Sequence, residues 1–402
     1  MKKPRVVWIF SHRIQYFVNL LDELYKRSNL EILAIYAHET KFIQDIGFSR
    51  NISWDNRQVT SFSEVVLPDS AKRQHGDFWN SRSDYLDKTL SKFQPDLVHL
   101  NGYTNAIQIQ GWLWSLRNHV PYVIRGDGDT LRVSTWKTYL RQALVRPITV
   151  GAAKVTHQGR LNQTFWQANG ASEHQLVWVP CVSDSQVFRV QAFADSTERD
   201  RFRKEHCITS GELVLVVSGK LEPRKRPADA IAALAKCRHL PVKLWFLGSG
   251  ELEPELQRQV EQYQLSGHVH WWGFQNQSQI PRILQAADVL LHTSQADPWP
   301  YSILEGAISG LALVLSDKIG SYLDWIAEPQ AALTFPCGNI DAIASCIETL
   351  VKNRELLLRL QNSALVQSSR HTEEIYCQIF EKLTFDLIGK KGTLNSRVDN
   401  RN

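Results

Sequence analysis

Long apolar segments are missing from this sequence of 402 residues. No run of about 18 apolar residues occurs, which excludes a membrane-spanning helix. After the basic stretch 1–5 the apolar run VVWIF is too short for a secretory signal, so we expect a cytoplasmic protein.

Cysteine pairs and metal-ligand clusters are missing as well. The six cysteines are scattered, with no C-x-x-C pair and no His/Cys group at metal-ligand spacing. We therefore expect reduced thiols, no structural zinc and no bound metal.

The charge imbalance is small. A net charge of +5 suits an anionic ligand or an acidic membrane face, but in a chain of this size it does not call for a nucleic-acid partner. The oligomeric state stays open.

What the sequence has is ordinary globular composition, with 43% hydrophobic and 22% charged residues, in a length that suits two domains of about 200 residues. Short β-branched runs alternate with amphipathic segments in both halves, which is typical of βαβ units. The predicted strands are 5–10, 30–37, 96–101, 121–125, 153–157 and 176–180 in the first half, and 213–218, 242–247, 268–272, 288–293, 312–316 and 331–335 in the second. The predicted helices include 15–27, 79–93, 228–238, 251–264, 279–286, 301–308 and 372–387.

The fold class is therefore α/β, with two Rossmann-like domains. The polar run 183–186 marks the boundary, giving domains 1–185 and 186–370. A C-terminal helix 371–389 follows, with a crossing back to the first domain left open, and we expect residues 390–402 to be disordered. Ligands of such folds bind at the carboxyl ends of the strands, here in a cleft between the domains.

A basic loop follows strand 213–218. It places Arg224, Lys225 and Arg226 before a helix that starts at Pro227, where the helix dipole disfavours cations. A phosphate bound there, also within reach of Lys220, would resolve the conflict. The alternative is a solvated basic loop.

The segment 244–250 ends in G-S-G and resembles only part of a dinucleotide fingerprint. It lacks the third glycine and the acidic residue that follows a second strand, so a nicotinamide cofactor is disfavoured and no cofactor is expected.

The stretch SQADPWPYSILEG, residues 294–306, carries two carboxylates. Pro300 stops any helix before Tyr301, so the amides of Tyr301 and Ser302 are predicted to form a helix N-terminus that can bind an anion. Asp297 lies before that terminus and Glu305 in its first turn. The alternative is a capping box, in which Glu305 serves only the helix start.

Six short motifs occur in one order between residues 213 and 350: GKL…K at 219–225, FLGSG at 246–250, WGF at 272–274, AADVL at 286–290, D…EGA at 297–307 and LSDKIG at 315–320. This array resembles the donor domain of the retaining family 4 glycosyltransferases, within the glycosyl transferases group 1. The resemblance implies the GT-B fold, in which two Rossmann-like βαβ domains face each other across a cleft. It assigns acceptor binding to residues 1–185 and nucleotide-sugar binding to residues 186–370.

The resemblance also implies roles in the donor domain. Lys225 matches a lysine that contacts the donor diphosphate, and Lys220 stands where arginine is usual. Glu305 is expected to hold the ribose hydroxyls, and Asp297 replaces a glutamate that contacts the donor sugar. The implied donor-binding positions are completed by Gly219, Gly248, Gly273, Phe274, Pro300, Tyr301 and Ser302.

The N-terminal half resembles the family more loosely. The motif H-R-I-Q-Y at 12–16 stands in place of a glycine-rich loop, so His12 and Arg13 are acceptor-side candidates, together with Asn101 and Asp127. Asp127-Gly-Asp129 also spells a D-x-D metal motif, but its glycines favour a turn.

The implied function is metal-independent, retaining transfer from a UDP- or GDP-sugar to a glycan, a lipid-linked glycan or another hydroxyl acceptor. Lys220, Lys225 and the amides at the helix start would stabilise the leaving diphosphate. Peripheral contact with the inner face of the membrane is left open, as are the donor sugar, the acceptor and the linkage. Two alternatives remain: a nucleotide-sugar 2-epimerase of the same fold, and a non-catalytic carbohydrate-binding protein.

Overall fold

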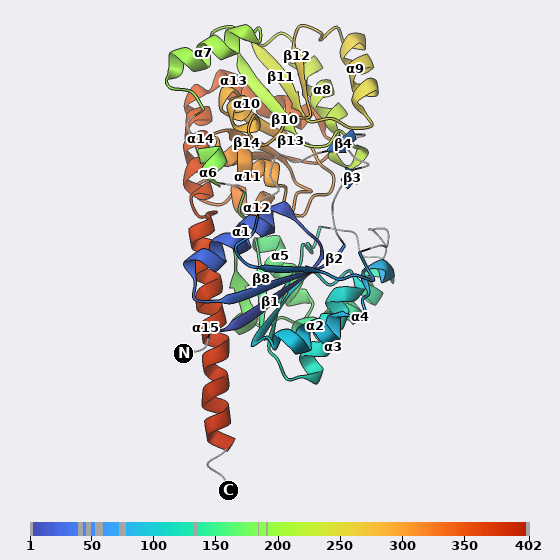
Figure 1. Cartoon of the computed structure of the whole chain (residues 1–402). Helices are drawn as coiled ribbons and strands as arrows, with labels where there is room; N and C mark the ends of the chain where they lie inside the picture. The colour runs from blue at the N-terminus through green and yellow to red at the C-terminus, as the bar shows by residue number, and fades with distance from the viewer. Residues whose placement is uncertain are drawn as a thin grey trace. The chain divides into compact units, whose positions relative to one another are not determined.

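The computed structural model describes residues 3–38, 43–45, 50–52, 59–71, 78–131, 136–183, 185–189 and 192–398. The chain divides into two units (Figure 1). Unit 1 comprises Met1–Lys41, Gln58–Val182 and Thr372–Asn402, and unit 2 comprises Phe42–Arg57 and Ser183–His371.

Unit 1 is built on a parallel sheet of seven strands, ordered β5-β2-β1-β6-β7-β8-β9. The strands are β1 (Arg5–His12), β2 (Glu31–His38), β5 (Ser63–Val66), β6 (Leu97–Asn101), β7 (Tyr122–Arg125), β8 (Lys154–His157) and β9 (Leu176–Trp178). The helices are α1 (Gln15–Arg27), α2 (Leu86–Phe93), α3 (Ala106–Arg117), α4 (Trp136–Val150), α5 (Arg160–Ala168) and α15 (Glu373–Val398), with the 3-10 helices η2 (Trp79–Ser81) and η3 (Glu173–Gln175).

Helices cover both faces of this sheet, because its strands are apolar on both sides. One core cluster joins the sheet to α1 and α15, and the other joins it to α2, α3, α4 and α5. From α15, Tyr376, Phe380 and Leu383 are buried in the first cluster together with Trp8 of β1. The last helix is therefore part of the core of unit 1.

Unit 2 contains a parallel sheet of six strands, ordered β12-β11-β10-β13-β14-β15. The strands are β10 (Leu213–Ser218), β11 (Val242–Leu247), β12 (Val269–Gly273), β13 (Val289–His292), β14 (Ala312–Ser316) and β15 (Ala332–Phe335). The helices are α6 (Ser185–Arg189), α7 (Ser196–Glu205), α8 (Pro227–Lys236), α9 (Glu253–Gln262), α10 (Ile280–Ala286), α11 (Tyr301–Ile308), α12 (Tyr322–Trp325), α13 (Ile340–Lys352) and α14 (Arg354–Ser368), with the 3-10 helix η4 (Pro223–Lys225). A separate antiparallel pair is formed by β3 (Ile43–Asp45) and β4 (Arg50–Ile52).

The two parallel sheets confirm the predicted α/β class, but two segments differ from expectation. The predicted helix 79–93 is divided into η2 and α2, because the carboxylate of Asp69 accepts hydrogen bonds from Ser83 Oγ (2.5 Å) and from the amide of Asp84 (2.8 Å) and so draws the chain away from a helical path. Residues 390–398, expected to be disordered, continue α15, since no proline interrupts the helix. The rest of that predicted tail, 399–402, lies outside the described residues.

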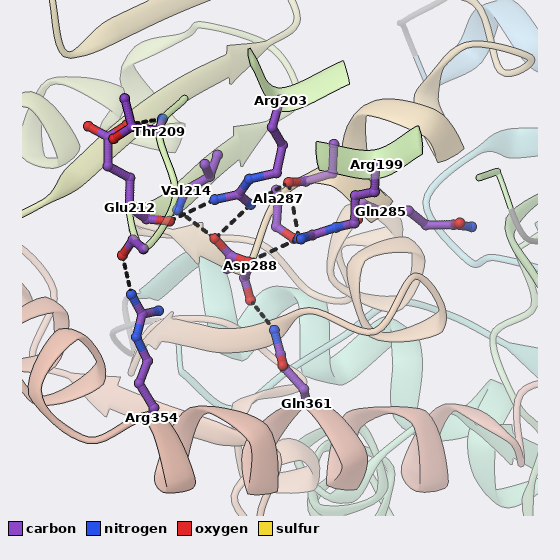
Figure 2. Close-up of polar contacts among 12 residues, drawn as sticks. Arg199, Arg203, Thr209, Glu212, Val214, Gln285, Ala287, Asp288, Arg354 and Gln361 are labelled. Carbon is purple, nitrogen blue, oxygen red and sulfur yellow. Dashed lines mark hydrogen bonds and ion pairs between the residues drawn. The ribbon is translucent and has the colours of Figure 1, made fainter. Parts of the chain in front are cut away.

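Asp288 fixes α7 to the amino ends of β10 and β13 (Figure 2). Its Oδ2 accepts hydrogen bonds from the amide of Val214 (2.8 Å) and from Arg203 (3.0 Å), and its Oδ1 accepts one from Arg199 (3.0 Å). The same arginines donate to carbonyl groups at the end of α10. A cavity of about 370 Å³ lies beside this cluster. Because the two arginines are committed to Asp288 and to backbone carbonyls, we interpret the cluster as a structural anchor.

Candidate functional site

The sheet of unit 2 reverses its strand order between β10 and β13. These strands are neighbours, with Leu215 paired to Val289, yet the chain runs from β10 to β11 on one side and from β13 to β14 on the other. In open α/β sheets the loops at such a point diverge and leave a crevice at the carboxyl ends of the strands. The loops concerned are residues 219–226 and 293–300.

Three predicted glycines lie side by side at this end of the sheet: Gly219 and Gly248 directly follow β10 and β11, and Gly273 ends β12. Gly219, Gly248 and Gly273 all have positive φ angles, of 131°, 138° and 63°. Gly219 donates its amide to Leu247 O, and Gly248 donates to Gly273 O, both at 2.9 Å. A Cβ on Gly248 would lie 2.0 Å from Gly219 O, so that position has no room for a side chain. The closely packed turns form a backbone surface that a ligand can approach.

The loops after β10 and β13 are tied together. Thr293 Oγ1 donates to the carbonyls of Lys225 (2.8 Å) and Arg226 (2.9 Å), and the amide of Gln295 donates to Arg224 O (3.0 Å). These bonds hold η4 against the loop that carries Asp297.

Two of the three cations before α8 have acidic neighbours of their own. Arg226, the N-cap residue with φ 50°, donates to Asp229 in the first turn of α8 at 2.7 and 3.0 Å. Arg224 donates to Glu222 at 2.7 Å. The predicted conflict with the helix dipole is thus partly resolved within the chain. Arg224 also donates to Ala296 O at 2.6 Å, so both Arg224 and Lys225 reach the neighbouring loop.

Lys225 and Asp297 form an ion pair through Asp297 Oδ2, with only 15% and 12% of their side chains exposed. Arg224 lies 3.8 Å and His292 Nε2 3.7 Å from the same oxygen. Burial alone would raise the pKa of Asp297, but His292 and the positive charge of Lys225 hold that pKa well below its usual range. The carboxylate is therefore ionised at neutral pH.

The backbone of Asp297 is braced by the loop after β14. Gly320 donates its amide to Asp297 O at 2.8 Å, and Asp297 forms an isolated parallel bridge with Ile319. A Cβ on Gly320 would lie 2.0 Å from Pro298 O, so glycine is required for this close approach.

Helix α11 begins at Tyr301, as predicted, with Pro300 as its N-cap and no side-chain cap. The alternative capping box is wrong, because Ser302 lies inside the helix. Glu305 is in the second turn rather than the first; it is 7% exposed, and its Oε1 accepts a hydrogen bond from Ser183 Oγ at 3.2 Å. The amides of the first turn lie at the positive end of the helix dipole.

The remaining donor-side candidates lie at the same end of the sheet. Lys220 is partly buried two residues after β10, and Phe274 directly follows β12. All predicted donor-binding residues therefore lie in unit 2, in the loops at the carboxyl ends of its strands or in α11.

The acceptor-side candidates lie at the carboxyl ends of strands in unit 1. His12 ends β1, with its Nδ1 2.9 Å from Ser11 Oγ, and Arg13 forms an ion pair with Glu64 at 3.1 Å. Asn101 ends β6, and its buried Oδ1 has no hydrogen-bond partner among the described residues.

Asp127 and Asp129 lie in the irregular segment that follows β7. Asp127 Oδ1 accepts a hydrogen bond from Gln158 Nε2 (3.1 Å), and Asp129 Oδ1 accepts one from the amide of Leu131 (3.0 Å), two residues on. The second bond is that of an Asx turn. In the described part of the chain, no three His, Cys, Asp or Glu residues are grouped so as to bind a metal.

Comparison with known proteins identifies the domain in unit 2. Residues 198–366 match the model of the family described as glycosyl transferases group 1. This stretch contains the switch in strand order, the glycine turns, the Lys225–Asp297 pair and α11. Unit 2 carries a glycosyl transferases group 1 domain. The predicted resemblance to this group is thereby confirmed.

Two proteins of known sequence are similar over larger parts of the chain. One is a putative glycosyltransferase, EpsD, of Bacillus subtilis, 28% identical over 46% of this chain; the match spans about half (49%) of EpsD. The other is the N,N'-diacetylbacillosaminyl-diphospho-undecaprenol alpha-1,3-N-acetylgalactosaminyltransferase of Campylobacter jejuni, 22% identical over 74% of this chain and 79% of its own length.

Among solved structures, Anabaena HepE in complex with UDP is similar over 95% of this chain and 100% of its own, with a TM-score of 0.73 and 18% identity. HepE in complex with UDP-glucose matches with a TM-score of 0.67. These similarities show that the fold is GT-B, as predicted.

Sequence reasoning did not single out three residues around the site carboxylates. Ser183 donates to Glu305, His292 lies beside Asp297, and Ser294 contacts His292. His292 and Ser294 were read as the end of a strand and the start of a loop, although their nearness to Asp297 in sequence was a usable signal. Ser183 is 122 positions from Glu305, and nothing in the sequence indicates that contact.

Proposed function

We propose that the chain is a retaining, metal-independent glycosyltransferase of family 4 that moves a sugar from a UDP- or GDP-sugar to a hydroxyl acceptor. The observation that carries this proposal is the Lys225–Asp297 pair, which joins η4, after β10, to the loop between β13 and α11, at the point where the strand order of the sheet reverses. A cation, a carboxylate and helix amides match a donor in which a diphosphate is joined to a sugar. The group 1 domain and the similarity to HepE, whose structures hold UDP and UDP-glucose, support it.

The diphosphate becomes more negative as it leaves, and this is the charge that the site must stabilise. Lys220, Lys225 and the first-turn amides of α11 supply positive charge and hydrogen-bond donors for it. With these groups, neutralisation of the leaving group needs no metal ion.

The two carboxylates serve different parts of the donor. Asp297 accepts hydrogen bonds from sugar hydroxyls, and Glu305 accepts them from the ribose. The turns at Gly219, Gly248 and Gly273 let the backbone approach the phosphates and the base.

The acceptor binds near His12, Arg13, Asn101 and Asp127. Its oxygen bonds to the anomeric carbon on the face from which the diphosphate departs, as the bond from that carbon to the phosphate oxygen breaks. The departing phosphate oxygen takes the acceptor proton. Retention follows, and no side chain needs to act as the base.

We further propose a lipid-linked or glycan acceptor at the inner face of the membrane. The relative from Campylobacter jejuni is named for a diphospho-undecaprenol acceptor. In unit 1, Leu113 and Leu116 of α3 and Leu144 of α4 are 46%, 47% and 68% exposed, and Arg117 and Arg146 of the same two helices are exposed as well. Both helices cover one face of the sheet. Apolar and basic side chains together suit an anionic bilayer surface. Within the described residues no helix is both long and apolar enough to cross a bilayer.

Screening the full chain against UDP-, GDP- and ADP-sugars by thermal shift tests the proposal. A true donor raises the melting temperature by mass action, and turnover of that donor with a lipid-linked or glycan acceptor should follow. Epimerised nucleotide sugar formed without acceptor would instead indicate a 2-epimerase. Donor binding with neither hydrolysis nor transfer would indicate a binding protein, and no binding would contradict the proposal.

A further inference from the structure

A buried histidine lies beside the carboxylate of Asp297 and takes no part in the proposed transfer reaction. His292 is the last residue of β13, and its side chain is 3% exposed. Its Nε2 lies 3.0 Å from Ser294 Oγ and 3.7 Å from Asp297 Oδ2. Ser294 is fully buried.

The position of Asp297 decides which tautomer of His292 fits. If Nε2 were the acceptor of the serine hydroxyl, its lone pair would also face a carboxylate oxygen, which is unfavourable. With the hydrogen on Nε2, the ring donates to Ser294 Oγ and presents its positive edge to Asp297. Burial lowers the pKa of His292, although Asp297 opposes this effect, so the ring is neutral at physiological pH.

The contacts of the Asp297 carboxylate are one-sided. Lys225, Arg224 and His292 all approach Oδ2. Within the described residues, Oδ1 has no side-chain or backbone partner. An ionised carboxylate can accept further hydrogen bonds at such an oxygen.

We propose that His292, oriented by Ser294, is a positioning residue that holds Oδ2 of Asp297 so that Oδ1 is presented to a hydroxyl of the donor sugar. The inference rests on the proposed function. A neutral imidazole can fill this role without adding charge. Without it, Lys225 would be the dominant attraction on the Asp297 carboxylate, which could then rotate and bind the Lys225 ammonium with both oxygens.

The experiment compares two ligands that differ only in the sugar. Isothermal titration measures the affinities for UDP-glucose and UDP, and in parallel for GDP-mannose and GDP, of the full-length protein and of His292→Leu. In the proposed function Asp297 contacts the sugar and not the nucleotide. His292→Leu should therefore weaken binding of the nucleotide sugar about tenfold, which is the effect of losing one charge-assisted hydrogen bond between a sugar hydroxyl and Asp297 Oδ1. Affinity for the bare nucleotide should change less than about threefold, within the ordinary effect of a remote substitution.

Two further variants separate positioning from damage to the fold. His292→Gln keeps a donor N–H and should restore sugar-dependent affinity to within about threefold, while Ser294→Ala should weaken it in the same direction as His292→Leu. His268→Leu, at the amino end of β12, is the matched control and should leave both affinities unchanged.

The outcomes separate the role of His292 from the proposed binding of a nucleotide-sugar donor. Equal weakening of nucleotide and nucleotide-sugar binding, or no change in either, would overturn the role of His292 while leaving the proposed function intact. If His292→Leu does not fold, the Gln and Ser294 variants decide by the same comparison. Failure of the unmodified protein to bind either nucleotide sugar would contradict the donor proposal itself.

Discussion

Lys225 and Asp297 are 72 positions apart in the sequence and form an ion pair at the carboxyl end of the sheet in unit 2. The pair joins the loop after β10 to the loop after β13. These two strands are parallel neighbours, and the strand order of the sheet reverses between them. Each partner is mostly buried yet partly open, which is the condition under which charges act strongly on a ligand.

Replacing Lys225 tests the stabilisation of the diphosphate. Lys225→Ala should lower kcat by about 100-fold or more, the size typical of removing one group that stabilises transition-state charge. Lys236→Ala, an exposed lysine on α8, is the matched control and should have near-normal activity. Steady-state kinetics with the donor found in the screen measures both, and a Lys225→Ala enzyme with normal kcat would contradict the placement of the diphosphate.

Replacing Glu305 tests the ribose contact. Glu305→Ala should reduce turnover by about 100-fold and, unlike the His292 variants, should weaken binding of the bare nucleoside diphosphate too, because the ribose belongs to both ligands. Titration calorimetry with UDP or GDP checks this. Ser183→Ala, which removes the partner of Glu305 Oε1, should give a smaller loss in the same direction. Unaltered nucleotide affinity in Glu305→Ala would exclude the ribose role.

The pH dependence of stability tests the charge state of Asp297. A depressed pKa in the folded protein contributes stability that is present above the unfolded value of about 3.9 and is lost as the pH falls toward the folded value. Asp297→Asn should therefore be less stable than the unmodified protein by a constant amount from pH 7 to about pH 5, and the gap should narrow below about pH 4. Urea unfolding across this range measures the difference in free energy of unfolding between the two proteins. If that difference grew on acidification, the pKa of Asp297 would be raised in the folded protein and not lowered.

The anchor at Asp288 yields a stability prediction far from the site. Asp288→Ala leaves Arg203, 7% exposed, without its carboxylate, and breaking a buried pair in this way costs about 3–5 kcal/mol. Asp200→Ala, an exposed aspartate beside the same cavity, should change the free energy of unfolding by less than about 0.5 kcal/mol. Urea denaturation compares them, and similar values for both would show that the cluster does not anchor α7.

Membrane contact through the exposed leucines of α3 and α4 can be tested with vesicles. Leu144→Glu places a negative charge on α4 and should reduce cosedimentation with vesicles that contain phosphatidylglycerol, because burial of the leucine is replaced by repulsion. Leu358→Glu on α14 of unit 2, where the leucine is 60% exposed against 68% for Leu144, is the control and should bind like the unmodified protein. Equal binding by both variants would exclude this face as the membrane contact.

The sequence was sufficient where a feature depends on neighbours along the chain. The run LVLVVS predicts β10, and Pro300 predicts the start of α11. It was insufficient where a feature depends on distant partners. The break between η2 and α2 requires Asp69, and the orientation of Glu305 requires Ser183, each brought near only by folding. Arg226 is an intermediate case, since its partner Asp229 lies one helical turn away and was within reach of sequence reasoning.

The return of α15 to unit 1 makes that unit discontinuous in the sequence. A fragment ending near Val182 would lack Tyr376, Phe380 and Leu383 and would leave the apolar side chains of β1 open to water. Shortening the protein from its carboxyl end should consequently destabilise unit 1 first, and a fragment of residues 1–182 expressed alone should be insoluble.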